Sequence, residues 1–395
     1  MADTETICGC IGVSKATIVG AIQEKGLKTV DEVKDCTNAS RSCGGCRPQV
    51  AQLLESVLGE KVRGKETICP CTNLERDEVV EVIREKHLTH LREVMSVLGW
   101  NTEEGCSKCR PALNYYLGMI WPEEYVDERE SRFVNERIHA NIQKDGTYSV
   151  VPRMYGGVTT PGELRRVAEV AEKYKVPMVK LTGGQRIDLF GVKKEDLPSL
   201  WSDLNMPSGS AYAKAIRTVK TCVGKDFCRF GTQNSIQMGI RMEKEFERLN
   251  TPAKVKMAVS ACPRNCAESG IKDLGVVGVE GGWEIYIGGN GGVQVRKGDF
   301  LCKVGTSDEV LEITGAYLQY YRETGRYGER TSQWVERIGL DCIREEVVVD
   351  VDHRKELLKR IHIALSQSKD PWQEIVSDEK VRKTIFEEIR VGTSN

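Results

Sequence analysis

The chain has 395 residues, a net charge of -1 and fifteen cysteines. A near-neutral charge indicates neither nucleic-acid binding nor attraction to an anionic membrane surface, and no run of ~18 apolar residues could span a bilayer. Clustered cysteines in this number are typical of a reduced, intracellular redox protein rather than of a small disulfide framework, so we expect a cytoplasmic protein. The length predicts about two to three domains.

The first third of the sequence contains two copies of one cysteine pattern. Each copy has a C-x-C pair, a long interval and then a C-x2-C pair that continues as Cys-Arg-Pro, and the intervals are 32 and 34 residues long. A repeated pattern of this kind indicates a tandem duplication. The cysteines of the first copy are Cys8, Cys10, Cys43 and Cys46, and those of the second are Cys69, Cys71, Cys106 and Cys109.

The interval between the cysteine pairs is predicted to be helical. Ser14 can cap a helix from Lys15 to Lys25 that ends at Gly26, and a second helix is expected after the capping box Thr29-x-x-Glu32. The proline after each C-x2-C pair suits the first position of a helix, which would place thiolates beside free backbone N–H groups. These donors and the positive end of the helix would stabilise a negatively charged cluster.

Both copies resemble the bacterioferritin-associated ferredoxin type of domain, which holds a 2Fe-2S cluster. The resemblance implies two such domains, residues 1–62 and 63–122, with the eight repeat cysteines as iron ligands. Two cysteine pairs also suit a structural zinc site, although a C-x-C pair is uncommon in zinc modules. A zinc-stabilised scaffold is therefore an alternative for this part of the chain. Cys36, outside the pattern, is expected to be an ordinary buried thiol.

Residues 123–136 are strongly charged and are expected to form a linker, after which 137–213 predict a small α+β unit. An Asp145-Gly146 turn between alternating segments indicates a hairpin. Thr160 and Glu163 form a capping box that opens a helix. The buried face of that helix is predicted to contain Leu164, Val167, Ala168 and Ala171.

Residues 214–350 contain two further cysteine pairs, Cys222-x5-Cys228 and Cys262-x3-Cys266. Four thiolates delivered two at a time are what a cubane 4Fe-4S cluster needs, and the spacing is not that of a zinc finger. We expect the cysteine loops at the ends of strands, where sites usually lie. Helices are predicted at about Thr232 to Leu249 and at Ser307 to Thr324, strands at Val255 to Ser260, Val276 to Val279 and Glu284 to Ile287, and a helical extension at 351–395.

Residues 137 to about 350, through the C-x5-C and Cys-Pro-Arg-Asn-Cys motifs, resemble the sirohaem-containing nitrite and sulfite reductases. With the ferredoxin-like repeats upstream, the chain is most similar to the C-terminal part of large subunits of the assimilatory, NAD(P)H-dependent nitrite reductases. The implied fold is multidomain α+β: two small helical 2Fe-2S domains, a ferredoxin-like half domain, and an α/β domain with sirohaem and a 4Fe-4S cluster. In that family the last cysteine, here Cys266, bridges the cluster to the sirohaem iron.

Sirohaem carries many carboxylates, so its site must supply cations and hydrogen-bond donors. The resemblance aligns Arg153, before Gly-Gly in VPRMYGG, with an anion-binding arginine, whereas Arg186 lies two residues after the family position. Isolated arginines are also often merely solvated, and Lys220 and Arg229 could simply neutralise the cluster. The expected substrate-binding residues are Arg153, Arg186, Lys220 and Lys272, and the expected cofactor-binding residues are Cys266, Arg153, Arg217, Arg229 and Arg264.

The resemblance implies six-electron reduction of nitrite to ammonium, with electrons passing through the 2Fe-2S and 4Fe-4S centres to sirohaem. The glycine-rich residues 288–292 lack the spacing of a dinucleotide-binding loop, so the expected donor is a separate flavin and NAD(P)H reductase module or a ferredoxin. The sequence is then either part of a longer chain or a subunit. Assimilatory-type sulfite reduction and a non-catalytic iron-sulfur electron carrier are the alternatives.

Many relatives contain two catalytic modules related by a pseudo-two-fold axis, whereas this chain contains one. A symmetric interface between two chains can replace an internal repeat. We therefore expect a homodimer in which each partner contributes basic residues to the other's sirohaem site.

Overall fold

The computed structural model describes residues 4–42, 44–59 and 66–386. The chain forms two compact units, Met1–Val79 with Gly291–Val295, and Val80–Asn290 with Arg296–Asn395. The division falls inside helix α4 (Arg76–Glu85). Among the described helices, none combines the length and apolar character needed to cross a bilayer.

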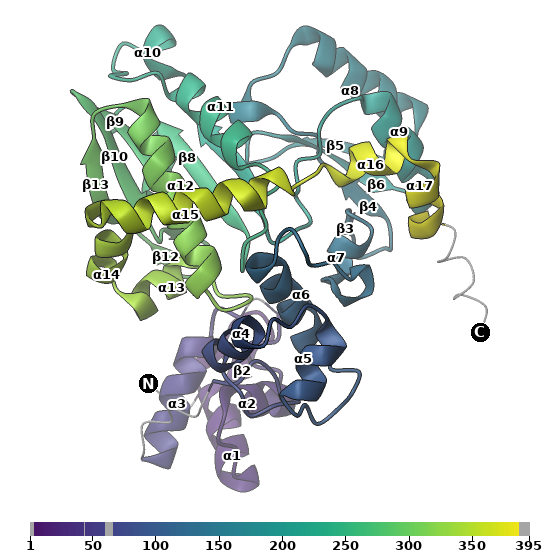
Figure 1. Cartoon of the computed structure of the whole chain (residues 1–395), viewed down its shortest axis with the longest axis vertical. Helices are drawn as coiled ribbons and strands as arrows, with labels where there is room; N and C mark the ends of the chain where they lie inside the picture. Colours follow the sequence, from purple (N-terminus) through teal and green to yellow (C-terminus); the bar gives the residue numbers. More distant parts are fainter. Residues whose placement is uncertain (1–3, 43, 60–65, 387–395) are drawn as a thin grey trace. The chain divides into compact units, whose positions relative to one another are not determined.

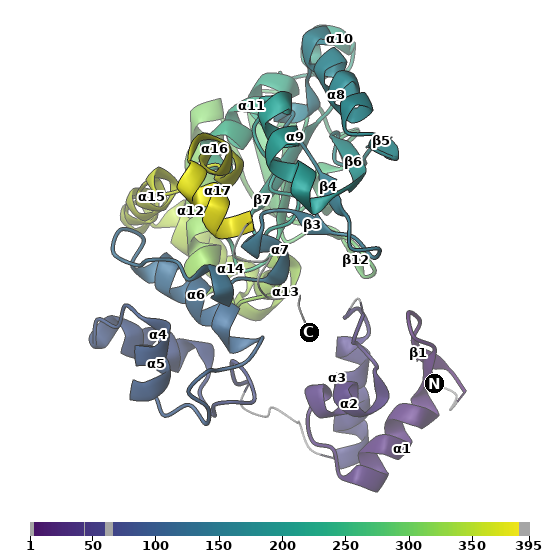
Figure 2. The same cartoon turned by 90° about the vertical axis from the view of Figure 1, so that its right-hand side faces the viewer.

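The first unit contains a small helical domain. A two-stranded sheet, β1 (Thr6–Cys8) and β2 (Val13–Ser14), leads into α1 (Lys15–Lys25), α2 (Val30–Thr37) and α3 (Arg47–Leu58), which pack on one another (Figure 2). Local signals set the helix ends: Ser14 caps α1, Gly26 ends it in the left-handed conformation, and Thr29 and Glu32 form the predicted capping box. The small core of this domain contains Ile18, Ile22, Val33, Val50 and Leu54.

The prolines after the C-x2-C pairs were predicted at the first helical position, and this prediction was wrong. Helix α3 begins at Arg47, so Pro48 is its second residue, and α6 (Cys109–Ile120) begins one residue earlier still, so Pro111 is its third. A proline fits anywhere in the first turn because those N–H groups have no acceptor within the helix. The consequence for the thiols is small, since Cys46 caps α3 and Cys109 opens α6.

The second ferredoxin-like repeat continues with α4, α5 (Leu91–Val97) and α6. The charged stretch predicted as a linker contains a 3-10 turn at Arg129–Ser131 and helix α7 (Val134–Arg137). It is fastened to α6 through Asn114, which accepts hydrogen bonds from the Tyr125 hydroxyl and the Glu128 N–H and donates one to Asp127. This stretch therefore packs on the repeat that precedes it.

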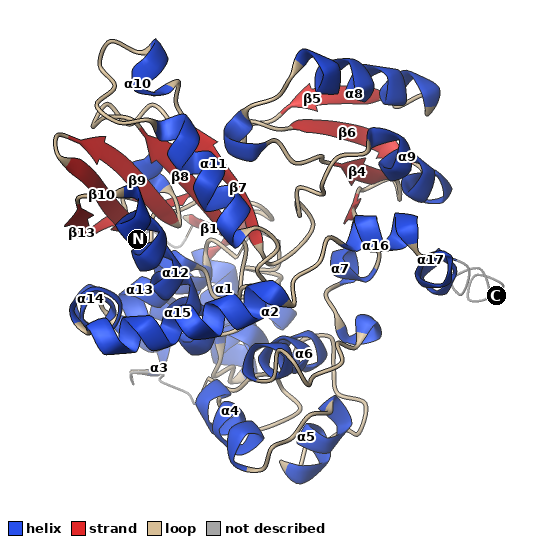
Figure 3. Cartoon of the chain, turned by 45° about the horizontal axis from the view of Figure 1, so that its top comes forward, coloured by secondary structure: helices blue, strands red, loops and turns tan. Residues whose placement is uncertain are grey.

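An antiparallel sheet in the order β3-β4-β6-β5 forms the half domain, from β3 (Asn141–Ile142), β4 (Tyr148–Val150), β5 (Met178–Leu181) and β6 (Ile187–Val192). Helices α8 (Pro161–Lys173) and α9 (Leu197–Leu204) cover it (Figure 3). The predicted inward face of α8 was wrong for Leu164, which is 45% exposed, and for Ala168. Val170 is buried instead, because the face that meets the sheet contains Val167, Val170 and Ala171.

The larger sheet has five strands in the order β13-β10-β9-β8-β7. Strands β7 to β9 are parallel, and β9, β10 and β13 are antiparallel. The strands are β7 (Ile216–Thr221), β8 (Val255–Ser260), β9 (Leu274–Val279), β10 (Gly282–Ile287) and β13 (Asp299–Val304). One face of this sheet packs against α11 (Ser235–Phe246) and α12 (Ser307–Thr324) around Met242, Phe246 and Tyr317 (Figure 1).

The C-terminal helices join the two sheets of this unit. Helix α15 (Val351–Ser366) packs along α12, and α16 (Pro371–Ser377) packs on α9, where the Trp372 and Trp201 rings stack 5.6 Å apart. Helix α17 (Glu379–Phe386) follows. The C-terminal helices α15 and α16 therefore connect the two sheets at a place away from the cysteine loops.

Candidate iron-sulfur and cofactor sites

The two cysteine pairs of the larger sheet come from the carboxyl ends of neighbouring parallel strands. Cys222 directly follows β7, and Cys262 follows β8 by two residues. The short helix α10 (Gly224–Phe227) separates Cys222 from Cys228. All four cysteines, including Cys266, line one cavity of about 390 Å³. The parallel arrangement therefore brings the predicted cluster ligands together, as the motif spacing indicated.

The half domain supplies the opposite wall of this cavity through Gly156, Gly157 and Gln185. Gln185 holds the half domain against the end of β7, because its side chain donates to Thr221 O at 2.8 Å and accepts from Thr221 N at 2.9 Å. Gly157 has a φ of +75°, and a Cβ there would lie 2.6 Å from Gln185 Oε1. This close approach requires glycine beside the cysteine loops.

One backbone donor points at the Cys222 sulfur. Ala261 N donates to Cys222 Sγ at 3.1 Å, and the Ser235 hydroxyl, which donates to Cys222 O at 3.0 Å, lies 3.2 Å from the same sulfur. Hydrogen bonds to cysteine sulfurs tune the potential of an iron-sulfur cluster. The four cysteines thus share one cavity, and the Cys222 sulfur has a backbone donor beside it.

Arg153 does not line this cavity. Its guanidinium is buried and donates to Glu243 Oε1 at 2.8 Å, to Ser208 O at 3.0 Å and to Arg217 O at 3.3 Å. Glu243 also accepts from the Gly156 and Val219 N–H groups. Arg153 therefore joins the half domain to β7 and α11, a role that its position in the sequence does not reveal.

A group of five basic residues, here called the cationic cluster, gathers where the half domain meets the first strands of the larger sheet. Burial first, and neighbouring positive charge second, lower the pKa of both Arg186 and Arg217 to about 10. Burial and the charge of Arg330 also lower the pKa values of Lys254 and Lys256. The cationic cluster consists of Arg186, Arg217, Lys254, Lys256 and Arg330.

The donors of the cationic cluster are only partly used. Arg330 pairs with Asp273 at 2.8 Å, yet its Nε and those of Arg186 and Arg217 are buried with no hydrogen-bond partner. Buried unsatisfied donors are rare unless a ligand or water completes them. The predicted Arg186 and Arg217 thus belong to one group, whereas sequence reasoning missed Lys254, Lys256 and Arg330. The only signal was a lysine on each side of Val255, at the start of a strand.

The predicted substrate lysines lie together on one carboxylate. Lys220 Nζ and Lys272 Nζ lie 3.2 Å and 2.9 Å from Glu268 Oε2. Hydrogen bonds from Lys272 and Lys220 lower the pKa of Glu268, so the carboxylate is ionised and neutralises part of their charge. Glu268 is two residues beyond Cys266.

Arg229 and Arg264 lie on the outer side of the cysteine loops. Both guanidiniums stack on the ring of Phe230, at 4.6 Å and 3.9 Å from its centre. Arg264 lines the cavity, but Arg229 does not. The geometry therefore places Arg264, but not Arg229, on the cavity that the four cysteines share.

The second repeat has a compact thiol site. The sulfurs of Cys69, Cys71, Cys106 and Cys109 all lie within 4.8 Å of one another. Backbone N–H groups point at them, from Cys106 to Cys109 Sγ at 3.0 Å and from Cys71 to Cys69 Sγ at 3.3 Å. This arrangement can hold metal through four thiolates, as the repeat predicted, and it suits a 2Fe-2S cluster or one tetrahedral ion.

In the first repeat, Cys8 and Cys46 are buried and Cys10 is exposed, whereas the predicted ligand Cys43 lies outside the described residues. Burial acts to raise the pKa of the Cys8 thiol, but hydrogen bonds from Ser40, Cys46 and nearby backbone groups together lower it. Cys36, expected as a buried thiol, is partly exposed and lies 3.1 Å from Lys25 Nζ.

Comparison with known families agrees with this arrangement. Residues 212–355 match the nitrite and sulphite reductase 4Fe-4S domain, 141–207 match the nitrite/sulfite reductase ferredoxin-like half domain, and 6–56 and 67–119 match the BFD-like [2Fe-2S] binding domain. An assimilatory-type sulfite reductase of Nitratidesulfovibrio vulgaris is 39% identical over 210 residues, which are 53% of this chain and 96% of that protein. The chain belongs to the nitrite and sulphite reductase family.

Longer relatives match nearly the whole chain. An NAD(P)H nitrite reductase of Bacillus subtilis is 65% identical over 392 residues, which are 98% of this chain and 49% of that protein. An assimilatory nitrate reductase electron transfer subunit of the same organism is 35% identical over 379 residues, which are 95% of this chain and 46% of that protein. The chain thus spans about half the length of these relatives. The family and the multidomain α+β fold predicted from the cysteine motifs are confirmed.

Proposed function

We propose that this chain is the sirohaem-dependent part of an enzyme that reduces nitrite to ammonium. Two observations on the same pair of strands carry the proposal: the cavity lined by four cysteines at the carboxyl ends of β7 and β8, and the cationic cluster with unused buried donors, which includes Arg217 of β7 and Lys256 of β8. The 65% identity to an NAD(P)H nitrite reductase over 98% of the chain supports nitrite as the substrate.

The residues fit a 4Fe-4S cluster and sirohaem. Four thiolates around one cavity suit the cluster, and Cys266, the exposed member of the set, can bridge to a neighbouring iron. Arg186, Arg217 and Arg330 offer unpaired Nε donors, and with Lys254 and Lys256 they match the carboxylates of the tetrapyrrole. When bound, sirohaem supplies an iron that accepts the anion and receives electrons singly.

Arg153, Arg186, Lys220 and Lys272 were predicted to bind the substrate, and the geometry separates their roles. Lys220 and Lys272 share Glu268 and can exchange it for an anion, which raises anion affinity and supplies protons near the site. Arg186 holds Gly209 O with one nitrogen and has a second nitrogen free for an anion. Arg153 supports the wall of the site through Glu243.

The two ferredoxin-like repeats deliver the electrons. We assign one 2Fe-2S cluster to each repeat, with the eight repeat cysteines as ligands, and a separate flavin and NAD(P)H reductase module or a ferredoxin as donor. The four clustered sulfurs of the second repeat support its assignment. The working form is a cytoplasmic homodimer, since the single catalytic module leaves room for a partner's basic residues.

Two other functions have specific support. Sulfite is the alternative anion, because a sulfite reductase of Nitratidesulfovibrio vulgaris matches over 96% of its own length, but its 39% identity is lower than the 65% of the nitrite reductase. The match to an electron transfer subunit favours a carrier without catalysis. Both functions use the same thiol sites as nitrite reduction. The sulfite reductase would bind sulfite at its tetrapyrrole, whereas the electron carrier would have no tetrapyrrole.

The experiment is an optical spectrum with iron, zinc and sulfide analysis of anaerobically reconstituted protein, followed by nitrite or sulfite addition to the dithionite-reduced form. We expect a tetrapyrrole spectrum that shifts with nitrite at lower concentration than with sulfite, and about eight irons per chain. A preference for sulfite would support the sulfite reductase, iron without a tetrapyrrole spectrum would support the electron carrier, and zinc without iron would contradict all three.

A further inference from the structure

Helix α6 belongs both to an iron-sulfur site and to the catalytic domain. Its first residue, Cys109, is one of the four clustered thiols. Two residues of its second half, Tyr115 and Tyr116, are buried and form hydrogen bonds with the domain of the larger sheet, here called the catalytic domain. From this double membership we propose that the second 2Fe-2S centre is the immediate electron donor to the catalytic domain, and that the first centre lies upstream of it. The proposal rests on the function proposed above.

Two tyrosines fasten α6 to the catalytic domain. The Tyr115 hydroxyl donates to Arg322 O at 3.1 Å, and the Tyr116 hydroxyl accepts from Tyr327 N at 2.9 Å. The rings of Tyr115 and Tyr327 are 5.7 Å apart, and Tyr116 is only 2% exposed. Because six residues of helix rise about 9 Å, the first contact with the catalytic domain lies within two turns of Cys109.

Hydrogen bonds continue from these tyrosines to the start of β7. Arg322 Nε donates to Asn250 O at 2.9 Å, and the next residue, Thr251, donates its N–H to Lys214 O at 2.9 Å. Lys214 Nζ also lies 4.7 Å from the centre of the Tyr327 ring. Two residues after Lys214, β7 begins and carries Arg217 of the cationic cluster. A series of contacts thus connects the helix that begins at Cys109 with the strand that carries Arg217 of the cationic cluster.

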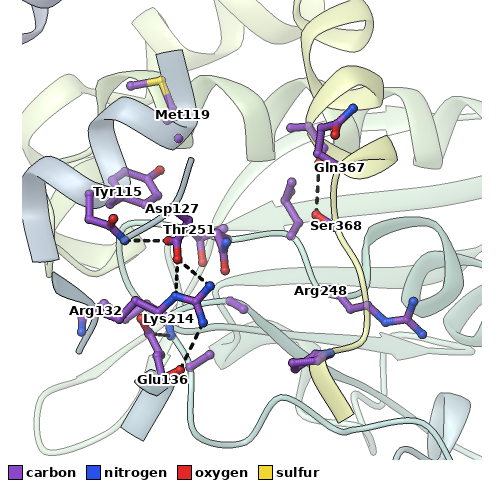
Figure 4. A pocket seen from close by; sticks show the side chains of 18 of the residues that line it. Tyr115, Met119, Asp127, Arg132, Glu136, Lys214, Arg248, Thr251, Gln367 and Ser368 are labelled. Carbon is purple, nitrogen blue, oxygen red and sulfur yellow. Dashed lines mark hydrogen bonds and ion pairs between the residues drawn. The ribbon is translucent and has the colours of Figure 1, made fainter. Parts of the chain in front are cut away.

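A cavity of about 670 Å³ lies beside this connection. Tyr115 and Met119 of α6 line it together with Lys214 and Thr251 from the catalytic domain, as Figure 4 shows. Arg132, Asp127 and Glu136 make the cavity polar. Tyr115, Arg322 and Lys214, which belong to the series of contacts between α6 and β7, therefore all border this polar space.

With both centres loaded, each transfer would take one electron from the second centre, which becomes oxidised, to the catalytic domain. The first centre would then re-reduce the second and be reduced in turn by the external donor. Dithionite replaces that donor in the test. Six such transfers, with eight protons from solvent, balance the conversion of one nitrite to ammonium and two waters.

The test compares two cysteine variants by pulsed electron paramagnetic resonance of the dithionite-reduced chain. Cys46→Ser removes the first centre, and Cys109→Ser removes the second as its matched counterpart. We expect the signal that remains in Cys46→Ser to relax rapidly, because its spin lies near the reduced catalytic centres, and the signal in Cys109→Ser to relax slowly. The reverse pattern, or equal relaxation, overturns the proposal. The spin of the reduced 4Fe-4S cluster is enough to speed the relaxation. The relaxation test therefore gives its answer even if nitrite is not the substrate.

A second variant leaves all cysteines in place. Tyr116→Phe removes the hydroxyl that accepts from Tyr327 N, and it should slow reoxidation of the 2Fe-2S signals after nitrite is added, with iron content and tetrapyrrole spectrum unchanged. Tyr174→Phe is the control, because its hydroxyl binds Asp203 in the half domain. Unchanged reoxidation in Tyr116→Phe together with slow relaxation in Cys46→Ser would rule out entry through α6.

Discussion

Arg153 and Glu243 form an ion pair that is completely buried, with Nη1 and Oε1 2.8 Å apart and neither side chain exposed. The two residues lie 90 positions apart in the sequence. Glu243 uses its second oxygen to accept the N–H groups of Gly156 and Val219. A single carboxylate therefore fixes both the glycine wall of the cysteine cavity and the strand that leads to Cys222.

Glu243→Gln should destabilise the protein by up to about 3 kcal/mol, less than the loss of a buried charge's sole partner, because Glu247 still lies 3.1 Å from Arg153 Nε. Urea unfolding followed by tryptophan fluorescence measures the loss. Arg241→Ala on the same helix is the control, since its pair with Asp308 is exposed and should contribute about 0–1 kcal/mol. Equal effects of the two changes would contradict a structural role for the buried pair.

Glu268→Gln should lower the KM for nitrite at low salt, because it frees Lys220 and Lys272 from their shared carboxylate. Glu268 is half exposed, so the expected change is modest, up to about fivefold, and should disappear as salt screens the charges. Steady-state kinetics with reduced methyl viologen measure it. If kcat falls while KM stays constant, Glu268 positions the Cys266 loop instead, where its φ of +60° lies in the left-handed region.

Local signals account for the elements that could be predicted from the sequence. Helix α12 was predicted from Ser307 to Thr324 and β8 from Val255 to Ser260, and both bounds are confirmed. The helix starts at the capping box of Thr306 and Glu309, which acts within one turn. The cysteine pairs were equally accessible to sequence reasoning, because ligand spacing within a loop is a local property.

Residues that meet only in the folded chain were not predictable. Lys254 and Arg330 are 76 positions apart, and their segments meet at Asp273, which pairs with Arg330 and accepts the Lys256 N–H. The sequence showed the family motif around Arg153, but it did not reveal that Glu243 of α11 is the partner of this arginine. Leu164 follows the helical period, yet it is exposed, because the position of the sheet selects which side of α8 is covered.

Cys266→Ser should remove about four irons per chain and abolish nitrite reduction, while the 2Fe-2S signals persist, because its thiolate is one of four around a single cavity. Iron analysis and electron paramagnetic resonance of the reduced protein measure both effects. Cys342→Ser is the matched control, since Cys342 is an exposed thiol of helix α14 (Leu340–Arg344) outside both cysteine patterns. Full iron content in Cys266→Ser would show that three thiolates hold the cluster without it.

His139 should make the half domain less stable in mild acid. Burial, followed by the charges of Arg132 and Arg129, lowers the pKa of His139 well below 6.5, and the neutral ring lies 2.8 Å from Arg132 Nη1 and faces Tyr212. Below pH 6.5 the unfolded chain therefore binds a proton that the folded chain excludes, so stability is present above that pH and is lost as the pH falls. The loss between pH 7.5 and 6.0 should be about 0.8 kcal/mol.

Urea unfolding at the two pH values, followed by tryptophan fluorescence, measures this loss of stability. Trp372 reports on the surroundings of His139, because its Nε1 donates to the His139 carbonyl at 2.7 Å. In His139→Gln the difference between the two pH values should shrink by that amount, because the proton-binding group of the unfolded chain is gone. His90→Gln, at a side chain that is 79% exposed, should keep the wild-type difference. A His139→Gln protein with the full wild-type pH dependence would mean that another buried group carries the effect.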